Sequence, residues 1–408
     1  MSSILAFTNA RIVDGTSEEA SEPRTIVVEG GTIREVAAKP KTPRTTRVID
    51  LAGKFVMPGL IDAHVHVVAA MANLAENAKQ PNEIASFRAA NIMRDMLARG
   101  FTTVRDVGGA GHGLVLAQEL GLIAGPRLVV SGKALGQTGG HTDFRGRFDD
   151  RGAFETRVGA LGRLVDGVDQ IRKAAREEIK GGAHFIKIMA NGGVASPTDP
   201  IHFLGFSKDE IRAVVEEAAN AGTYVSAHLY TDEAIARAVE CGVHSLEHCN
   251  LIRPDTAKKA AKAGAVAVPT LVTYDALATE GASLGLPPES VAKIETVRKA
   301  GLESLAIMRK AKLTMAYGSD LLGEMHRHQS EEFVIRAKVL PIHEVIGSAT
   351  HVAAKLLGLE GKVGVLAEGA HADMIVVDGN PLEDPKLLTG QGASLSMILQ
   401  AGRFVKGG

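Results

Sequence analysis

The chain has 408 residues, of which 45% are hydrophobic and 23% are charged, with a formal net charge of −1 at pH 7. This balance excludes a disordered chain and is typical of a globular protein. A nearly neutral chain has no overall basic field to attract phosphate groups, so we expect no nucleic-acid partner. The length exceeds that of an ordinary small domain and suits a large barrel with an added module.

Compartment and membrane association follow from the same composition. No run approaches the roughly 20 apolar residues that cross a bilayer, and residues 1–8 lack the basic flank and apolar region of a signal peptide. The cysteines Cys241 and Cys249 are too few for a disulfide framework and fit a reducing compartment. We therefore expect a cytoplasmic protein that does not bind a membrane.

The two ends of the chain share one pattern. Short β-rich runs, such as Arg47–Asp50 near the start and residues 372–378 near the end, are separated by Gly, Pro and charged residues. Chain ends often lie close together in space. We therefore expect residues 1–57 and 364–408 to pair into one small β-sandwich domain, with residues 58–363 forming the main domain.

Between the ends, short apolar runs rich in β-branched residues alternate with longer amphipathic stretches. This alternation is typical of βα units and a parallel sheet, and eight repeats favour a closed (β/α)8 barrel of the TIM type. Helices are expected at residues 82–99 and 208–221, the second preceded by a capping box of Ser207 and Glu210. The expected strands are residues 60–64, 102–106, 127–131, 184–188, 224–228, 244–248, 265–269 and 313–318.

Side chains that bind metals follow several of these strands. In such a barrel the active site is built at the carboxyl ends of the strands. His64 and His66, two residues apart on an extended segment, point to the same side and can close on one ion. His228 ends the fifth strand, His248 ends the sixth, and Asp320 follows the eighth. These side chains should therefore converge on one mouth of the barrel.

Lys187 lies inside the apolar run 185–189 of the fourth strand. An unpaired ammonium group is costly to bury there. One alternative is an edge position from which the amine reaches solvent. Others are a deprotonated amine that acts as a nucleophile, or one that takes up carbon dioxide and becomes a carbamate between two cations. The five other candidate ligands favour the carbamate.

These residues resemble the amidohydrolase superfamily, and the resemblance covers essentially the whole chain. Residues 58–66, Pro-Gly-Leu-Ile-Asp-Ala-His-Val-His, resemble its entry motif, and the likeness is to binuclear members with a carboxylated lysine on the fourth strand. Within the family, residues 137–141, 186–189, 227–230 and 246–248 resemble prolidase-like Xaa-Pro dipeptidases and N-acyl amino acid hydrolases, which are related to imidazolonepropionase.

The resemblance implies a ligand set for two divalent ions, for which zinc is the default choice. A hydroxide that bridges the ions would attack the amide carbonyl, and Asp320 would also act in catalysis by passing its proton to the leaving amine. The implied ligands are His64, His66 and Asp320 for one ion, His228 and His248 for the other, and carboxylated Lys187 as the bridge.

The resemblance also suggests residues that contact the substrate. Residues 131–150 are too long for an ordinary βα connection and predict a functional loop. His141 on this loop and Tyr230, two residues after a ligand, would act in catalysis by binding the substrate carbonyl or terminal carboxylate. Tyr230 could instead simply pack. Arg145 and Arg147 could pair with a substrate carboxylate, although a salt bridge within the loop is the alternative.

The predicted function is hydrolysis of an amide bond, removing the C-terminal residue of a dipeptide (Xaa-Pro or Xaa-hydrophobic) or of an N-acyl amino acid. One alternative is a cyclic-amide or lactone hydrolase, or a deaminase, on the same fold, but Lys187 argues against the mononuclear deaminases. The other is a catalytically silent barrel scaffold, which a complete ligand set disfavours. The relatives suggest a homo-oligomer.

Overall fold

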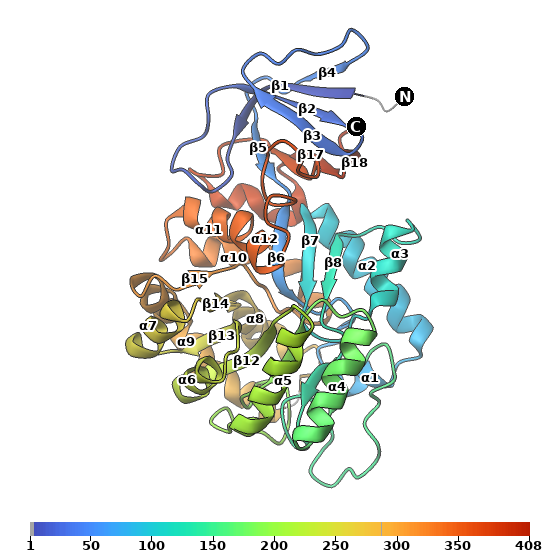
Figure 1. Ribbon diagram of the computed structural model, residues 1–408, viewed down its shortest axis with the longest axis vertical. Helices are drawn as coiled ribbons and strands as arrows, with labels where there is room; N and C mark the ends of the chain where they lie inside the picture. Colours follow the sequence, from blue (N-terminus) through green and yellow to red (C-terminus); the bar gives the residue numbers. More distant parts are fainter. Residues whose placement is uncertain (1–3, 287) are drawn as a thin grey trace.

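A sheet built from both ends of the chain lies beside the main body of the molecule (Figure 1). The structure is a computed structural model that describes residues 4–286 and 288–408. β16 pairs antiparallel with β5 and so joins the two ends. The strands of this sheet are β1 (Ile4–Ile12), β2 (Arg24–Glu29), β3 (Thr32–Ala37), β4 (Arg47–Asp50) and β5 (Phe55–Pro58) from the start of the chain, and β16 (Met374–Val377), β17 (Leu395–Gln400) and β18 (Arg403–Lys406) from its end.

This sheet domain has a hydrophobic core to which both ends of the chain contribute. Phe7, Ile26 and Val56 from the first strands pack with Met374 and Leu399 from the last ones. Burial of these apolar side chains holds the two distant segments together. The prediction of one β domain formed by both ends is confirmed, whereas its boundaries at 1–57 and 364–408 stay a prediction.

All eight strands expected between the two ends form, and they run parallel to one another in two sheets. The barrel closes where the N–H of Ala63 donates to the carbonyl of Tyr317, at 2.8 Å, just after the last strand. The strands are β6 (Leu60–Val65), β7 (Phe101–Asp106), β8 (Arg127–Val130), β11 (Ile186–Met189), β12 (Val225–Thr231), β13 (Ser245–Leu251), β14 (Val266–Val268) and β15 (Thr314–Met315).

The third strand of the barrel is split, which the sequence did not predict. β8 pairs with β7, whereas β9 (Ala134–Gly136) pairs with β11 and with β10 (Gly162–Leu164). The expected loop at residues 131–150 is therefore wrong in its first part, because the short apolar run of β9 is fully buried between its neighbours. The loop proper is the β9–β10 loop, residues 137–161.

Helices and short helical turns surround the strands (Figure 1). They are α1 (Leu74–Lys79), α2 (Asn82–Ala98), α3 (His112–Glu119), α4 (Val168–Lys180), α5 (Lys208–Asn220), α6 (Asp232–Glu240), α7 (Pro254–Lys262), α8 (Leu271–Ala276), η1 (Leu277–Gly281), α9 (Pro288–Lys310), η2 (Gly323–His328), α10 (Glu331–Arg336), α11 (Ile342–Ser348), α12 (His351–Leu356), η3 (Pro385–Leu388) and η4 (Gly390–Gly392). Within residues 4–286 and 288–408, none of the helices combines the length and apolar character that a bilayer crossing requires.

The two helices expected at residues 82–99 and 208–221 are present as α2 and α5. The capping box of α5 has both of its hydrogen bonds. The Glu210 N–H donates to the Ser207 hydroxyl at 3.2 Å, and the Ser207 N–H donates to the Glu210 carboxylate at 2.7 Å. These bonds satisfy N–H groups that the first turn of a helix leaves unpaired, so this helix begins where the sequence predicts.

Candidate metal centre

Three of the expected ligands meet where the barrel closes. Nε2 of His64 and Nε2 of His66 each lie 3.3 Å from Oδ1 of Asp320. Among the described residues these form the one group of three metal-type side chains whose ligand atoms all lie within 4.8 Å of one another. Two imidazoles and a carboxylate are a donor set that suits a divalent ion such as zinc. The residues present therefore fit a metal ion.

Asp320 has a left-handed backbone, with φ at +53°. Residues other than glycine rarely adopt this conformation, and holding one there costs of order 1–3 kcal/mol. The N–H of Asp320 donates to the carbonyl of His64 at 2.9 Å. The buried carboxylate of Asp62 accepts the N–H of His64 at 3.0 Å and the hydroxyl of Ser319 at 2.6 Å. These bonds compensate the strain and tie the ligand strands to each other.

Burial and charge act in opposite directions on Asp320. Burial alone would raise the pKa of its carboxyl group, but the imidazoles of His64 and His66 outweigh burial and hold the pKa well below its usual range. Asp320 is therefore an anion at neutral pH. Its charge attracts both imidazoles.

His248 and His228 bring the second set of imidazoles to the same mouth. The ring of His248 lies 4.8 Å from that of His64 and 4.6 Å from that of His228, measured between centroids. Burial lowers the pKa of both His228 and His248 well below the usual value. Both rings are therefore neutral at pH 7, which is the form that binds a metal ion.

Lys187 lies on β11, between β9 and β12 in the interior of the sheet. Only 1% of its surface is exposed, so the alternative in which its amine reaches solvent is wrong. Burial lowers the pKa of Lys187 to about 8, although Glu247 and Asp320 act in the opposite direction. The neutral amine, which is the form that reacts with carbon dioxide, is therefore more populated than for a lysine in water.

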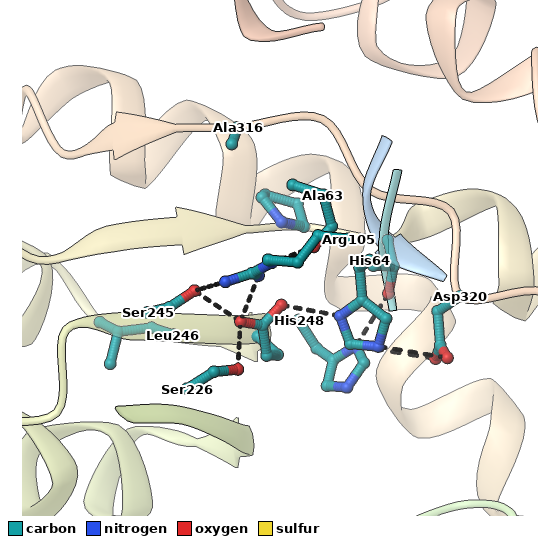
Figure 2. Close-up of polar contacts among 12 residues, drawn as sticks. Ala63, His64, Arg105, Ser226, Ser245, Leu246, His248, Ala316 and Asp320 are labelled. Carbon is teal, nitrogen blue, oxygen red and sulfur yellow. Dashed lines mark hydrogen bonds and ion pairs between the residues drawn. The ribbon is translucent and has the colours of Figure 1, made fainter. Parts of the chain in front are cut away.

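A buried carboxylate behind the ligands, Glu247, was not assigned a role from the sequence. It accepts hydrogen bonds from Nδ1 of His64 at 2.7 Å, from Arg105 at 2.8 Å, from Ser226 at 2.7 Å and from Ser245 at 2.6 Å (Figure 2). Burial would raise the pKa of Glu247, but Arg105 and His64 hold it well below its usual range. Because Nδ1 of His64 donates its proton to Glu247, Nε2 of the same ring is the nitrogen that can bind an ion.

The signal for this network was present in the strands. Arg105 lies in β7, in which every residue is buried, and Glu247 lies in β13, which is buried except at Leu251. Two charged side chains of opposite sign in buried strands predict a pair, because isolated buried charges are costly. Their pairing across the barrel, however, needs the closed fold.

Two other candidate ligands are oriented by neutral groups. Nδ1 of His66 is 2.8 Å from the carbonyl oxygen of Gly108, and Nδ1 of His248 is 2.8 Å from the hydroxyl of Thr270. A metal-binding imidazole usually has its second nitrogen engaged in this way. The contacts leave Nε2 of both rings available.

Comparison with known proteins identifies the family. Residues 55–403 match the model of the amidohydrolase family. The chain belongs to this family. Ochratoxinase from Aspergillus niger is 31% identical to this amidohydrolase over 366 residues, which cover 86% of this chain and 76% of that protein.

Two solved structures are similar to this chain over nearly its whole length. A crystal structure of a prolidase complexed with N-methylphosphonate-L-proline is 52% identical, with a TM-score of 0.97 over 99% of this chain and 100% of that one. A Xaa-Pro dipeptidase with bound methionine in its active site is 28% identical, with a TM-score of 0.87 over 99% of this chain and 100% of that one. The predicted barrel, the superfamily and the closeness to prolidase-like enzymes are confirmed, and the amidohydrolase is a hydrolase that acts on amide bonds.

His141 reaches the candidate ligands from the β9–β10 loop. Its ring stacks on that of His228, with centroids 4.1 Å apart and an interplanar angle of 24°. Nδ1 of His141 lies 2.7 Å from the hydroxyl of Ser196 and 3.6 Å from Oδ2 of Asp199. The structure thus brings His141 to the candidate metal centre, and its role in catalysis stays a prediction.

Tyr230 is buried beside His228 and His248. Its ring lies 4.6 Å from that of His228 and 5.2 Å from that of His248. Its hydroxyl accepts a hydrogen bond from the hydroxyl of Tyr274 at 3.1 Å. Burial raises the pKa of Tyr230, so it remains a phenol that can donate a proton in a hydrogen bond. Its contact with substrate stays a prediction.

The two loop arginines differ in their surroundings. The guanidinium of Arg145 forms hydrogen bonds of 2.7 and 2.8 Å with the carboxylate of Asp143, so the alternative of a salt bridge within the loop is present. Arg147 instead lines a cavity of about 460 Å³ together with His202 and Lys293. A contact of either arginine with a substrate carboxylate stays a prediction.

Proposed function

We propose that this amidohydrolase is a binuclear metal-dependent enzyme that removes the C-terminal residue of a dipeptide, Xaa-Pro or Xaa-hydrophobic, or of an N-acyl amino acid. The observation that carries the proposal is the convergence of the imidazoles and Asp320 at the carboxyl ends of the barrel strands, beside a fully buried lysine. A silent scaffold would have no need to keep such a costly set of buried groups together.

Each half of the centre has its own donors. His64, His66 and Asp320 would hold one divalent ion, with zinc the default, and His228 and His248 would hold the other. When bound, two such ions would lower the pKa of a water molecule, polarise the scissile carbonyl and stabilise the charge that develops on its oxygen.

Lys187 would complete the centre by a covalent change. Its neutral amine would attack carbon dioxide, forming a nitrogen–carbon bond and releasing one proton. The product is a carbamate, which has one negative charge and two oxygen donors. The burial that lowers the pKa of Lys187 to about 8 supports this step, since it favours the neutral amine.

The chain's own groups would move the proton and hold the substrate. Asp320 is ionised, so it can accept a proton as water attacks the amide carbon and can pass it to the leaving nitrogen. Tyr230 and His141 lie against His228 and would bind the carbonyl oxygen or the terminal carboxylate.

The choice of substrate is supported by the relatives. The similar prolidase was crystallised with N-methylphosphonate-L-proline, which favours a substrate with proline after the scissile bond. The likeness to ochratoxinase favours a second candidate, the N-acyl amino acids of the ochratoxin type. Both substrate classes present an amide with a carboxylate on its leaving-group side.

The test is turnover of a substrate panel by protein loaded with zinc, with the metal content measured on the same sample. The panel contains Xaa-Pro dipeptides, dipeptides ending in a large apolar residue, N-acyl amino acids, cyclic amides and lactones, and metal-stripped protein is the control. Release of the C-terminal amino acid would support the proposal. Turnover of cyclic substrates alone would replace it with the cyclic-amide alternative, and bound metal without any turnover would favour the silent scaffold.

A further inference from the structure

Lys293 on α9 makes an unusual set of contacts with one loop. Its ammonium group donates hydrogen bonds to the backbone carbonyls of Gly193, Ser196 and Asp199, at 2.9, 2.8 and 2.9 Å. Its side chain is only 16% exposed. A lysine ammonium has three donors, and here all three are used by carbonyls of the β11–α5 loop, residues 190–207. Lys293 therefore clamps this loop to α9.

The clamped loop holds His141 from one side. Ser196 and Asp199, whose carbonyls Lys293 binds, also place their side chains at Nδ1 of His141, at 2.7 and 3.6 Å. The Asp199 carboxylate accepts the N–H of Gly193 at 2.8 Å, which braces the loop internally. The Ser196 hydroxyl and the Asp199 carboxylate therefore both hold the Nδ1 side of the His141 ring.

The packing around His141 leaves its ring little freedom. A Cβ atom added at Gly193 would clash with the ring of His141, so the loop backbone and the ring are in direct contact. The ring of His141 also stacks on the ring of His228, with the two centroids 4.1 Å apart. A shift of the loop would therefore move the ring relative to the candidate metal centre.

We propose that Lys293 is a positioning residue for the reaction: by clamping the β11–α5 loop, it fixes Ser196 and Asp199 and, through them, the ring of His141 beside His228. The inference rests on the proposed function, in which His141 contacts the substrate. It adds a residue from α9, distant in sequence from every candidate ligand. Small displacements of such a group lower the rate strongly, by about a hundredfold for 1 Å.

The first test removes the ammonium group and keeps the length of the side chain, with Lys293→Met. The matched control is Lys299→Met on the same helix, because Lys299 is 78% exposed and forms an ion pair with Glu295, at 3.7 Å. Hydrogen exchange of the amides in residues 190–207 should become about tenfold faster in Lys293→Met and stay unchanged in the control. Unchanged exchange in Lys293→Met would overturn the clamp.

The second test asks whether Lys293 acts through His141. Lys293→Met should lower kcat/KM by roughly ten- to a hundredfold, with the zinc content unchanged, and should alter the same parameter, kcat or KM, that His141→Ala alters. The double variant should be within about threefold of His141→Ala alone, because the clamp has no ring left to position. Independent, multiplying effects of the two substitutions would contradict the inference.

A third readout does not depend on turnover. The ring ¹³C–¹H signal of His141 in the zinc-loaded protein, assigned by its loss in His141→Ala, should shift or broaden in Lys293→Met and not in Lys299→Met. An unmoved signal would refute the inference even if the enzyme were active. If the wild-type protein hydrolysed no amide, the proposed function would fail, while this signal and the exchange rates would still decide whether Lys293 positions His141.

Discussion

The two halves of the candidate metal centre differ in charge. In the half formed by His64, His66 and Asp320, a carboxylate lies 3.3 Å from both imidazoles, and its negative charge attracts them. The half formed by His228 and His248 has two neutral imidazoles and a buried lysine, and none of these three is an anion.

The contrast extends to the groups behind the ligands. His64 is oriented by the anionic Glu247, whereas His248 is oriented by the neutral hydroxyl of Thr270. Hydrogen bonds to charged groups are roughly twice as strong as those between neutral groups. Charged side chains of the protein therefore hold His64, His66 and Asp320 in place. The half with His228 and His248 lacks a negative charge, which carboxylation of Lys187 would supply. Each of the following variants tests one part of this difference.

The largest effect should come from Asp320→Asn. The amide removes the anion that draws the first half together and cannot accept the proton, so kcat should fall by about 10⁴-fold. The measurement is kcat on the best substrate of the panel, with zinc content and circular dichroism on the same sample. Asp378→Asn, at an exposed ion pair with Lys54 in the sheet domain, is the control and should keep wild-type turnover. Full activity of Asp320→Asn would move the proton transfer to another residue.

Lys187→Ala should act on the second half. Without the carbamate, the zinc content should drop from about two ions per chain to about one, and turnover should fall by roughly 10²- to 10³-fold. Added formate or acetate should restore part of the activity, because a small carboxylate can enter the vacated space and provide the missing charge. The same salts added to wild-type protein are the control, and a fully active Lys187→Ala protein would contradict the carbamate assignment.

Glu247→Gln should weaken the first half from behind. His64 loses its anionic acceptor, so zinc affinity should decrease by about 10- to 100-fold. The free energy of unfolding should also fall, by about 3–5 kcal/mol, since Arg105 is left as a buried charge without its partner. Metal titration and denaturant unfolding measure the two effects. Glu344→Gln breaks an exposed pair with Arg309 and should change stability by less than about 1 kcal/mol.

Thr270→Val should produce the smallest change. It removes the neutral acceptor of Nδ1 of His248 while keeping the shape of the side chain, at a cost of about 1 kcal/mol, or about fivefold in affinity for the second ion. Stepwise zinc titration should show the first ion unaffected. Equal loss of both ions would mean that the two halves are coupled and that the difference between them is not one of local charge.

The local patterns of the chain predict much of this molecule. The eight barrel strands, the joining of both ends in one sheet domain and the start of α5 directly after Ser207 all follow from periodicity, turns and caps. The candidate metal ligands could also be predicted, because the carboxyl ends of all the barrel strands lie on one face of the barrel. Such features depend on residues close together in the chain or on a rule of the fold.

Other features depend on contacts between distant segments. β9 is a strand because it pairs with β10 and β11, and its residues alone indicate a loop. The left-handed backbone of Asp320 is held by His64 and Asp62, more than 250 positions earlier. Propensity cannot predict a conformation that is unfavourable in isolation.

The sequence by itself determined which residue types could bind two cations and which strands would present them. The tertiary structure decided how they are held: that Glu247 and Arg105 pair behind His64, that Lys187 is shut off from solvent, and that Lys293 clamps the loop beside His141. The physical reason is that strand and helix patterns act over a few residues, whereas burial, and with it the strength of every charge interaction, exists only once the barrel has closed.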